Sequence, residues 1–156
     1  MLRRADPGDL PALAALIAAH PMQLLAQDLP ELQRIMDDPE NRVMIWKSDQ
    51  NRIAGFAVIE NLYPQVVFLT NMAVAEPGRG LGAALIADTL RVVFADMGAH
   101  RLFCDVAFDN APALAAFRRA GLVQEGTMRQ CWLRPDAIWA DCHAFSMLKH
   151  EWKNIL

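Results

Sequence analysis

The sequence predicts an α/β fold of the α+β type, with a mixed central sheet of about seven strands and flanking helices. Three features predict it. Apolar strand-like runs joined by short turns fill residues 42–74 and indicate an antiparallel N-terminal meander. A glycine-rich turn then leads into a helical pattern and another strand, which should lie parallel to the strand before the turn. Two final strands flank a polar turn at 134–136 and predict a C-terminal β-hairpin.

The composition fits one domain over residues 1–156. Of the 156 residues 54% are hydrophobic, which suits one full core and not two. The net charge of −3 provides no basic field for a polyanion, so no nucleic-acid partner is expected. No apolar run reaches the roughly 18 residues of a membrane span, and Asp6 and Asp9 replace a signal-peptide core. We therefore expect a cytoplasmic protein without a membrane partner.

The cysteines and histidines predict no metal site. Cys104, Cys131 and Cys142 lack metal-binding spacing and indicate a reducing compartment, although Cys131 and Cys142 could still pair across the final hairpin. The histidines are scattered without the spacing of metal ligands; they are His20, His100, His143 and His150.

The first half of the chain predicts two helices and four strands. Asp9 is the expected N-cap of a helix with Leu10 and Leu13 on its apolar face, and Asp28 with Glu31 predicts a capping box for a second helix. The expected strands are 2–4, 42–46, 52–60 and 66–74, with turns at 48–51 and 61–65.

The second half predicts two more helices and three strands. A helical pattern runs from Gly82 to Gly98, and Asp109 or Asn110 caps a helix that ends at Gly121. The expected strands are 101–107, 122–133 and 137–148.

The turn at 78–82 indicates a site for a phosphorylated ligand. Closely spaced glycines allow positive φ, and the free N–H groups of the following helical turn attract anions. Gly78-x-Gly80-x-x-Ala83 also fits a dinucleotide fingerprint, with Asp105 placed as a ribose-binding residue. The P-loop pattern is absent, because no Gly-Lys-Ser/Thr follows.

The element order and two motifs resemble the GNAT superfamily of acetyl-CoA-dependent N-acetyltransferases. The motifs are Met72-Ala-Val-Ala-Glu-Pro-Gly-Arg-Gly-Leu-Gly-Ala-Ala-Leu85 and Asn110-Ala-Pro-Ala-Leu-Ala-Ala-Phe117-Arg-Arg-Ala-Gly121-Leu122, the latter similar to the family's N-x-x-A-x-x-L-Y-x-K-x-G-F. The ending from Glu125 to Trp152 is similar to the RimJ/RimL branch, which acetylates protein N-termini or small amines. An NADP-binding oxidoreductase is less favoured, because only one strand-helix unit follows the glycine turn.

The resemblance implies acetyl-CoA as cosubstrate and a cofactor site without metal. Backbone groups of Met72, Ala73 and Val74 would hold the thioester and the pantetheine arm, and Asn110 would bond to the pantetheine. The pyrophosphate would bind backbone amides of Gly78, Arg79, Gly80, Leu81, Gly82 and Ala83.

The implied chemistry is attack of an amine on a thioester carbonyl, which needs a general base and a source of protons. Asp105 is the first candidate base and Glu60 the second. Phe117 stands in the cofactor-binding segment where the family has a tyrosine, and it cannot donate a proton; Tyr63 is the candidate acid. Pro77 departs from the Arg or Gln usual in the turn.

The expected function is acetyl transfer to a primary amine, either a peptide N-terminus or a small molecule, within a ternary complex. A catalytically silent CoA-binding or regulatory domain is the alternative, because Phe117 removes the usual acid. Four residues could form an acceptor wall, a homodimer surface or simply core: Arg129, Trp132, Arg134 and Trp139. Segments 19–28 and 61–65 and the final hairpin should border the acceptor, but they carry no substrate motif.

Overall fold

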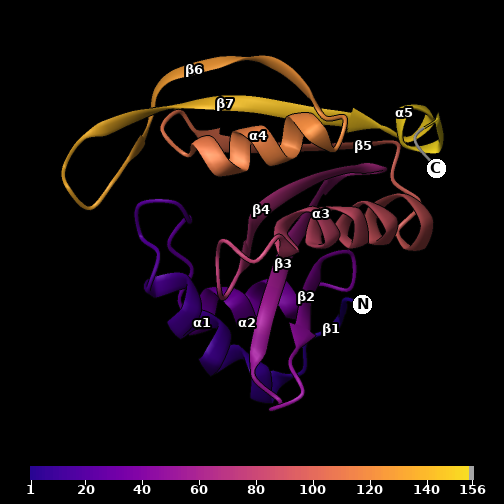
Figure 1. Cartoon of the computed structure of the whole chain (residues 1–156). Coiled ribbons are helices and arrows are strands. Elements are labelled where there is room, and N and C mark those ends of the chain that lie inside the picture. Colours follow the sequence, from indigo (N-terminus) through magenta and orange to yellow (C-terminus); the bar gives the residue numbers. More distant parts are fainter. Residues whose placement is uncertain (155–156) are drawn as a thin grey trace.

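The computed structural model describes residues 1–154 and confirms a mixed α/β fold built on one sheet. The seven strands lie in the order β1-β2-β3-β4-β5-β7-β6. Their bounds are β1 Arg3–Arg4, β2 Arg42–Lys47, β3 Ile53–Tyr63, β4 Val66–Val74, β5 Arg101–Ala107, β6 Val123–Leu133 and β7 Trp139–Leu148. The helices are α1 Leu10–Ala18, α2 Leu29–Asp37, α3 Leu81–Arg91, α4 Ala111–Arg119 and α5 Lys149–Asn154. Figure 1 shows their arrangement.

Strands β1 to β4 form the predicted antiparallel meander. One boundary was wrong: the expected turn at 61–65 shrinks to two residues, because β3 continues to Tyr63 and pairs there with Val66. Gln65 makes the tight reversal with a φ of 66°.

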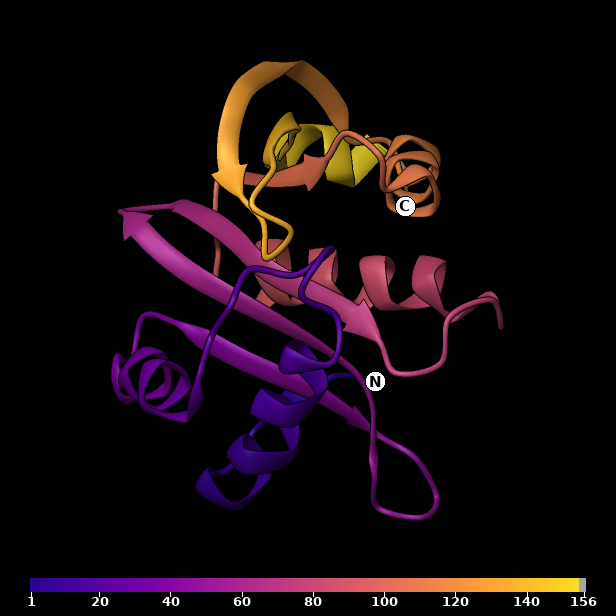
Figure 2. The same cartoon turned by 90° about the vertical axis from the view of Figure 1, so that its left-hand side faces the viewer.

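Helices cover both faces of the sheet. On one face, α1 and α2 contribute Leu13 and Leu32 to a core with Phe56 of β3. On the other face, α3 and α4 contribute Leu85 and Leu114 to a larger core that continues onto β4, β5 and β7. The sheet is thus the middle layer of three, as the two views of Figures 1 and 2 show.

Asp9 occupies the predicted N-cap position of α1, but its side chain does not cap that helix. Instead Asp6 caps a 3₁₀ turn, Pro7–Asp9, and Asp9 completes the reciprocal half of that capping box. At α2 only half of the expected box forms: Asp28 accepts from the Glu31 N–H at 3.0 Å, while the Glu31 carboxylate pairs with Arg34.

The second half follows the predicted order, with one addition. A π-helical turn, Val92–Asp96, extends α3 before Gly98 turns the chain at a φ of 68°. β5 lies parallel to β4, as expected. The final hairpin folds back so that β7, not β6, pairs with β5. The sequence pattern did not reveal α5, whose six residues are too few for a periodic signal.

Candidate active site

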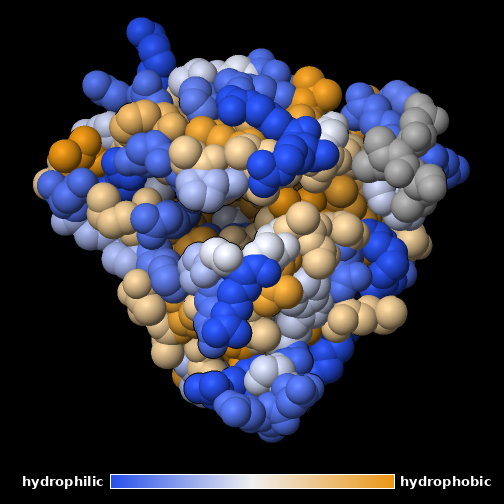
Figure 3. All heavy atoms as spheres, viewed as in Figure 1, coloured by the Kyte–Doolittle hydropathy of each residue, from blue (hydrophilic) through white to orange (hydrophobic). Residues whose placement is uncertain are grey.

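β4 and β5 separate towards their carboxyl ends, and the space-filling view shows a hollow near the middle of this face of the molecule, which we call the cleft (Figure 3). These parallel strands pair only where Val66, Val67 and Phe68 meet Arg101, Leu102 and Phe103. Beyond Phe103, β5 pairs with β7, whereas β4 stays with β3. Figure 1 shows the two halves of the sheet spreading apart from this junction. The carboxyl ends of β4 and β5 therefore form the two walls of a V.

A β-bulge in β4 marks the point of separation. Val58 of β3 pairs with Asn71 and Ile59 pairs with Leu69, so Thr70 is the extra residue. A bulge bends its strand and increases the local twist. Thr70 lies two residues after Phe68, the last residue of β4 that pairs with β5, which explains why β4 turns away there.

The bulge leaves one edge of β4 open at Met72, Ala73 and Val74. Their other edge pairs with β3, where Met72 opposes Ala57 and Val74 opposes Gly55. In the described chain no strand pairs with the edge that faces the cleft. Such an edge offers backbone donors and acceptors to an extended ligand that contains amides.

The glycine turn lies directly after this open edge, at the N-terminus of α3. Gly78 and Gly80 have φ values of 87° and 74°, and Gly80 is the left-handed N-cap of α3. A Cβ at Gly78, Gly80 or Gly82 would meet no protein atom within 4 Å, so the turn faces open space. The free N–H groups of the first turn of α3 can bind a phosphate group. Arg79 lies at the surface and pairs with Glu76 at 3.0 Å.

Asn110 lies on the opposite wall, just after β5. It is the N-cap of α4, and its Oδ1 accepts from the Ala113 N–H at 3.4 Å. This bond uses the amide oxygen alone, so the Nδ2 group can still donate to a ligand.

Asp105 lies on β5 beyond the junction with β4. Cys104 and Val106 point into the core under α3 and α4, so Asp105 points to the other face of the sheet. The side chain keeps contact with solvent, and partial desolvation by its neighbours raises the pKa of its carboxyl above the usual value. No hydrogen bond or ion pair to the described residues compensates its charge.

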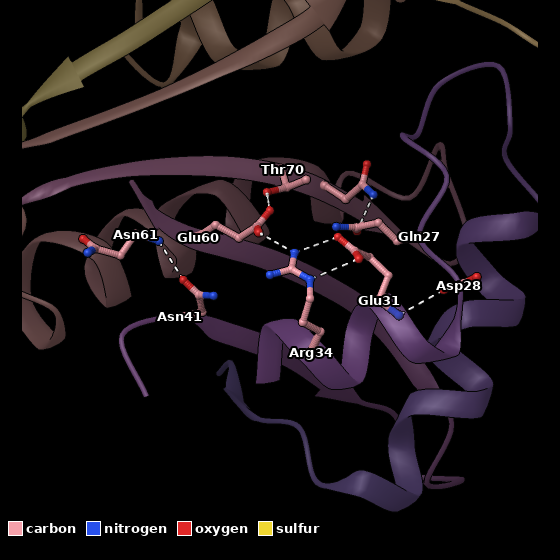
Figure 4. Close-up of polar contacts among 9 residues, drawn as sticks. Gln27, Asp28, Glu31, Arg34, Asn41, Glu60, Asn61 and Thr70 are labelled. Carbon is pink, nitrogen blue, oxygen red and sulfur yellow. Dashed lines mark hydrogen bonds and ion pairs between the residues drawn. The ribbon is translucent and has the colours of Figure 1, made fainter. Parts of the chain in front are cut away.

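Glu60 lies on the same face as Asp105 but is already engaged. It pairs across the ladder with Phe68, whose ring lies 4.9 Å from that of Phe103. One Glu60 carboxylate oxygen accepts from the Thr70 hydroxyl, and the other lies 3.6 Å from Arg34 (Figure 4). Arg34 also pairs with Glu31 at 2.8 Å.

Two predicted residues lie away from the open walls. Tyr63 is 60% exposed and pairs with Val66 at the start of β4, the opposite end of that strand from the glycine turn. Phe117 is buried in the core, with its ring 6.1 Å from that of Phe145. Cys104 is buried as well, and burial raises the pKa of its thiol to about 12, which makes it a poor nucleophile.

No sequence pattern predicted the contact between segment 19–28 and β4. The Asn71 side chain accepts from the Leu25 N–H at 2.9 Å and donates to the Leu25 carbonyl at 2.8 Å and to Gln27 at 2.7 Å. These partners are more than forty positions apart, and no local pattern records such a pairing. Because Asn71 stands next to the bulge, its bonds hold the segment near the start of the open edge.

Two absences concern the described residues alone. Among residues 1–154, no group of three His, Cys, Asp or Glu side chains could hold a metal ion. No helix in this range is both long and apolar enough to cross a membrane. The three cysteines are unpaired, so the open question of Cys131 and Cys142 is answered in favour of free thiols.

Comparison with known proteins gives one family and one group of structures. The model of the acetyltransferase (GNAT) family matches residues 12–122. A spermidine N-acetyltransferase from Vibrio cholerae, solved with CoA and spermine, superposes with a TM-score of 0.84 at 20% identity, covering 99% of this chain and 98% of that chain. A mutant of the Vibrio cholerae enzyme SpeG gives a TM-score of 0.86 at 19% identity, with coverages of 99% and 96%. Comparison with curated protein sequences gives no significant match. At these identities the structures show a shared fold.

Proposed function

Because the chain belongs to the acetyltransferase (GNAT) family, and thus to the acetyl-CoA-dependent N-acetyltransferases, we propose that it acetylates a primary amine by direct attack within a ternary complex. The amine is that of a small molecule or a peptide N-terminus. The observation that carries the proposal is the open edge of β4 at residues 72–74, which runs straight into the glycine turn before α3.

This continuity suits the cosubstrate. Its pantetheine arm is extended and contains amides, so it can pair with Met72, Ala73 and Val74 as an added strand. Its pyrophosphate then lies at residues 78–83, where the N-terminus of α3 stabilises negative charge. Asn110 can donate to the arm from the other wall.

Asp105 is the preferred general base. An acceptor amine enters as an ammonium, and it must lose a proton before its nitrogen can attack the thioester carbonyl. Asp105 has a raised pKa and no partner in the part of the chain that the structure describes, whereas the Glu60 carboxylate already contacts Thr70 and Arg34. Backbone N–H groups at the open edge of β4 stabilise the oxyanion.

The thiolate leaves without a dedicated acid. As the new C–N bond forms, the C–S bond breaks and the sulfur takes the electron pair. Phe117 has no proton to give, and Tyr63 lies at the far end of β4. Water therefore protonates the thiolate.

The acceptor face suits a cationic amine. Glu60 and Asp105 flank the adjacent rings of Phe68 and Phe103 on one face of the sheet. Carboxylates attract an ammonium, and aromatic rings favour both cations and methylene chains. The V. cholerae structures of spermidine N-acetyltransferases agree with a small polyamine, whereas the RimJ/RimL-like ending favours a peptide N-terminus.

A thiol-release assay with an amine panel tests the function. The panel holds a monoamine, a polyamine, a free amino acid and a short peptide, and acetyl-CoA binding is titrated in parallel. We expect acetyl-CoA to bind and at least one amine to be acetylated. Binding without turnover on every amine would instead favour a silent CoA-binding domain. Stabilisation by NADPH but not by acetyl-CoA would favour the oxidoreductase alternative.

A further inference from the structure

We propose that Arg134 is a positioning residue that sets the width of the acceptor end of the cleft. It does so by joining three segments that are far apart in the sequence: the C-terminal hairpin, the corner between β5 and α4, and the segment between α1 and α2. The expected effect of Arg134 on the KM of the amine rests on the proposed function. The expected effect on the mobility of the joined segments does not.

Arg134 follows the last residue of β6 and is only 6% exposed. Its Nη1 atom lies 2.9 Å from both carboxylate oxygens of Asp109, at the corner between β5 and α4. The same atom donates to the Met22 carbonyl at 3.5 Å, in the segment between α1 and α2. Figure 2 shows the hairpin tip, in yellow and orange, beside that indigo segment.

Two aromatic rings hold the guanidinium in place. Its central carbon lies 5.8 Å from the Phe108 ring centroid and 5.9 Å from that of Trp132. Phe108 belongs to the corner between β5 and α4, and Trp132 belongs to β6. Stacking on both rings therefore joins the hairpin to this corner, as the ion pair with Asp109 also does. Arginine stacks on such rings through its planar group, which a lysine cannot reproduce.

The burial of Arg134 is not explained by stability. Its charge partner Asp109 is 45% exposed, and an ion pair with so accessible a partner contributes little to stability. Here the pair is also incomplete, because Arg134 Nε is buried without a partner among the described residues. Burial therefore leaves one N–H group of Arg134 without a hydrogen bond within residues 1–154, and a side chain that is buried at this energetic cost indicates a geometric role.

The three joined segments all border the cleft. Asp109 directly precedes Asn110, which caps α4 on one wall. Met22 lies three residues before Leu25, which Asn71 binds on the other wall. Arg134 therefore spans the acceptor end from wall to wall, and its loss should let the segment at Met22 move while the cap at Asn110 stays.

Steady-state kinetics test the role. Arg134→Met should raise the KM of the best amine at least about tenfold, since small displacements of positioned reactants cost that much or more. The Kd of acetyl-CoA should change less than about twofold. Arg134→Lys should recover part of the loss, because it keeps the charge. Arg118→Met is the control, since Arg118 also stacks on a ring, that of Phe145 in β7, but donates to Gln124 of β6 and does not join the corner to the segment at Met22. An unchanged amine KM in both Arg134 variants would overturn the proposal.

Hydrogen exchange gives a second readout that needs no substrate. In Arg134→Met, and in Asp109→Asn if the first variant folds poorly, amides at residues 22–27 should exchange at least about tenfold faster, while those of α4 stay unchanged. Thermal unfolding identifies a variant that has lost its fold. If wild type acetylates no amine, the proposed function fails, yet faster exchange in this segment still supports the link. Unchanged exchange with an intact fold refutes it.

Discussion

Lys47 Nζ lies 2.8 Å from Asp9 Oδ1, and this ion pair fastens β2 to the 3₁₀ turn that precedes α1. The other Asp9 oxygen accepts from Arg3 at 2.9 Å and from the Asp6 N–H at 3.1 Å. Asp9 is 6% exposed, so its carboxylate has exchanged water for these donors. The charge is stable in this position only because both cations and the amide compensate it.

This arrangement predicts a loss of stability in acid. Burial alone would raise the pKa of Asp9, but the hydrogen bonds from Lys47, Asp6 and Arg3 outweigh it and lower the pKa to about 2. A carboxylate with a depressed folded-state pKa stabilises the fold above its unfolded pKa, and this contribution disappears as the pH falls through the folded value. Between about pH 5 and pH 2, Asp9 should account for a fall of on the order of 2 kcal/mol in the free energy of unfolding.

Urea unfolding of wild type and Asp9→Asn across this pH range measures the effect. The variant should be less stable at pH 6, and the difference between the two proteins should shrink towards pH 2. The comparison isolates Asp9 from Glu125, whose pKa is also lowered to about 2, by Arg101 and Ser146, and which titrates in both proteins. A difference that does not vary with pH would contradict the prediction.

Replacing Asp105 should separate activity from stability. We expect Asp105→Asn to lower kcat by roughly 10²-fold or more, as for the loss of a general base, and to remove the acidic limb of the pH-rate profile. Because the folded-state pKa of Asp105 is raised, its charged form destabilises the fold near neutral pH. The same variant should therefore unfold at a slightly higher temperature at pH 7.

Glu60→Gln is the matched control, since it also replaces a carboxylate by an amide on the same face. It should keep the acidic limb of the profile and most of kcat. If the Glu60 variant loses the limb and the Asp105 variant keeps it, the assignment of the base is reversed.

Two glycine-to-alanine changes in the same turn should have opposite effects. Gly80 has a φ of 74°, so Gly80→Ala should cost about 1 kcal/mol in the free energy of unfolding and weaken acetyl-CoA binding. Gly82 lies within α3, where a Cβ meets no atom within 4 Å, so Gly82→Ala should raise stability by up to about 1 kcal/mol. Thermal unfolding of both variants with acetyl-CoA titration checks this, and equal stability shifts would refute it.

The thiols should differ sharply in reactivity. Burial raises the pKa of Cys104 and of Cys142 to about 12, whereas Cys131 is exposed. With a thiol reagent such as DTNB at pH 8, one thiol per chain should react fast in the folded protein and three after denaturation. Cys131→Ser should abolish the fast phase. Fast labelling of a second thiol would show that a buried cysteine is accessible.

Most of the fold could be predicted from local patterns. The strands of the meander are apolar runs bounded by turn residues. The glycine turn sets one helix start through its backbone conformation, and Asn110 sets another through its capping side chain. The parallel return of β5 follows from the handedness and length of a strand-helix-strand connection. Errors occurred where two signals compete within a few residues, as at Asp6 and Asp9, both of which are good caps.

The candidate site was only partly predictable. The roles of Met72, Gly80, Asp105 and Asn110 remain predictions, but their segments could be named because each lies in a motif with its own residue pattern. The contacts of Glu60 with Arg34 and Thr70 could not be predicted, since neither partner is close to Glu60 in sequence. The position of Tyr63 far from the open edge could not be predicted either, because it depends on where β4 separates from β5.

Local chemistry along the chain was thus enough to establish the strands, four of the helices, their order and the turn that precedes α3. Folding in three dimensions determined where β4 separates from β5 and how Arg134 joins three distant segments. It also determined which of the two candidate bases, Glu60 and Asp105, has no partner among residues 1–154. The physical reason is range. Backbone preferences and hydrophobic periodicity act over a few residues. The bend at Thr70 and the raised pKa of Asp105 instead depend on neighbours that packing brings from elsewhere in the chain.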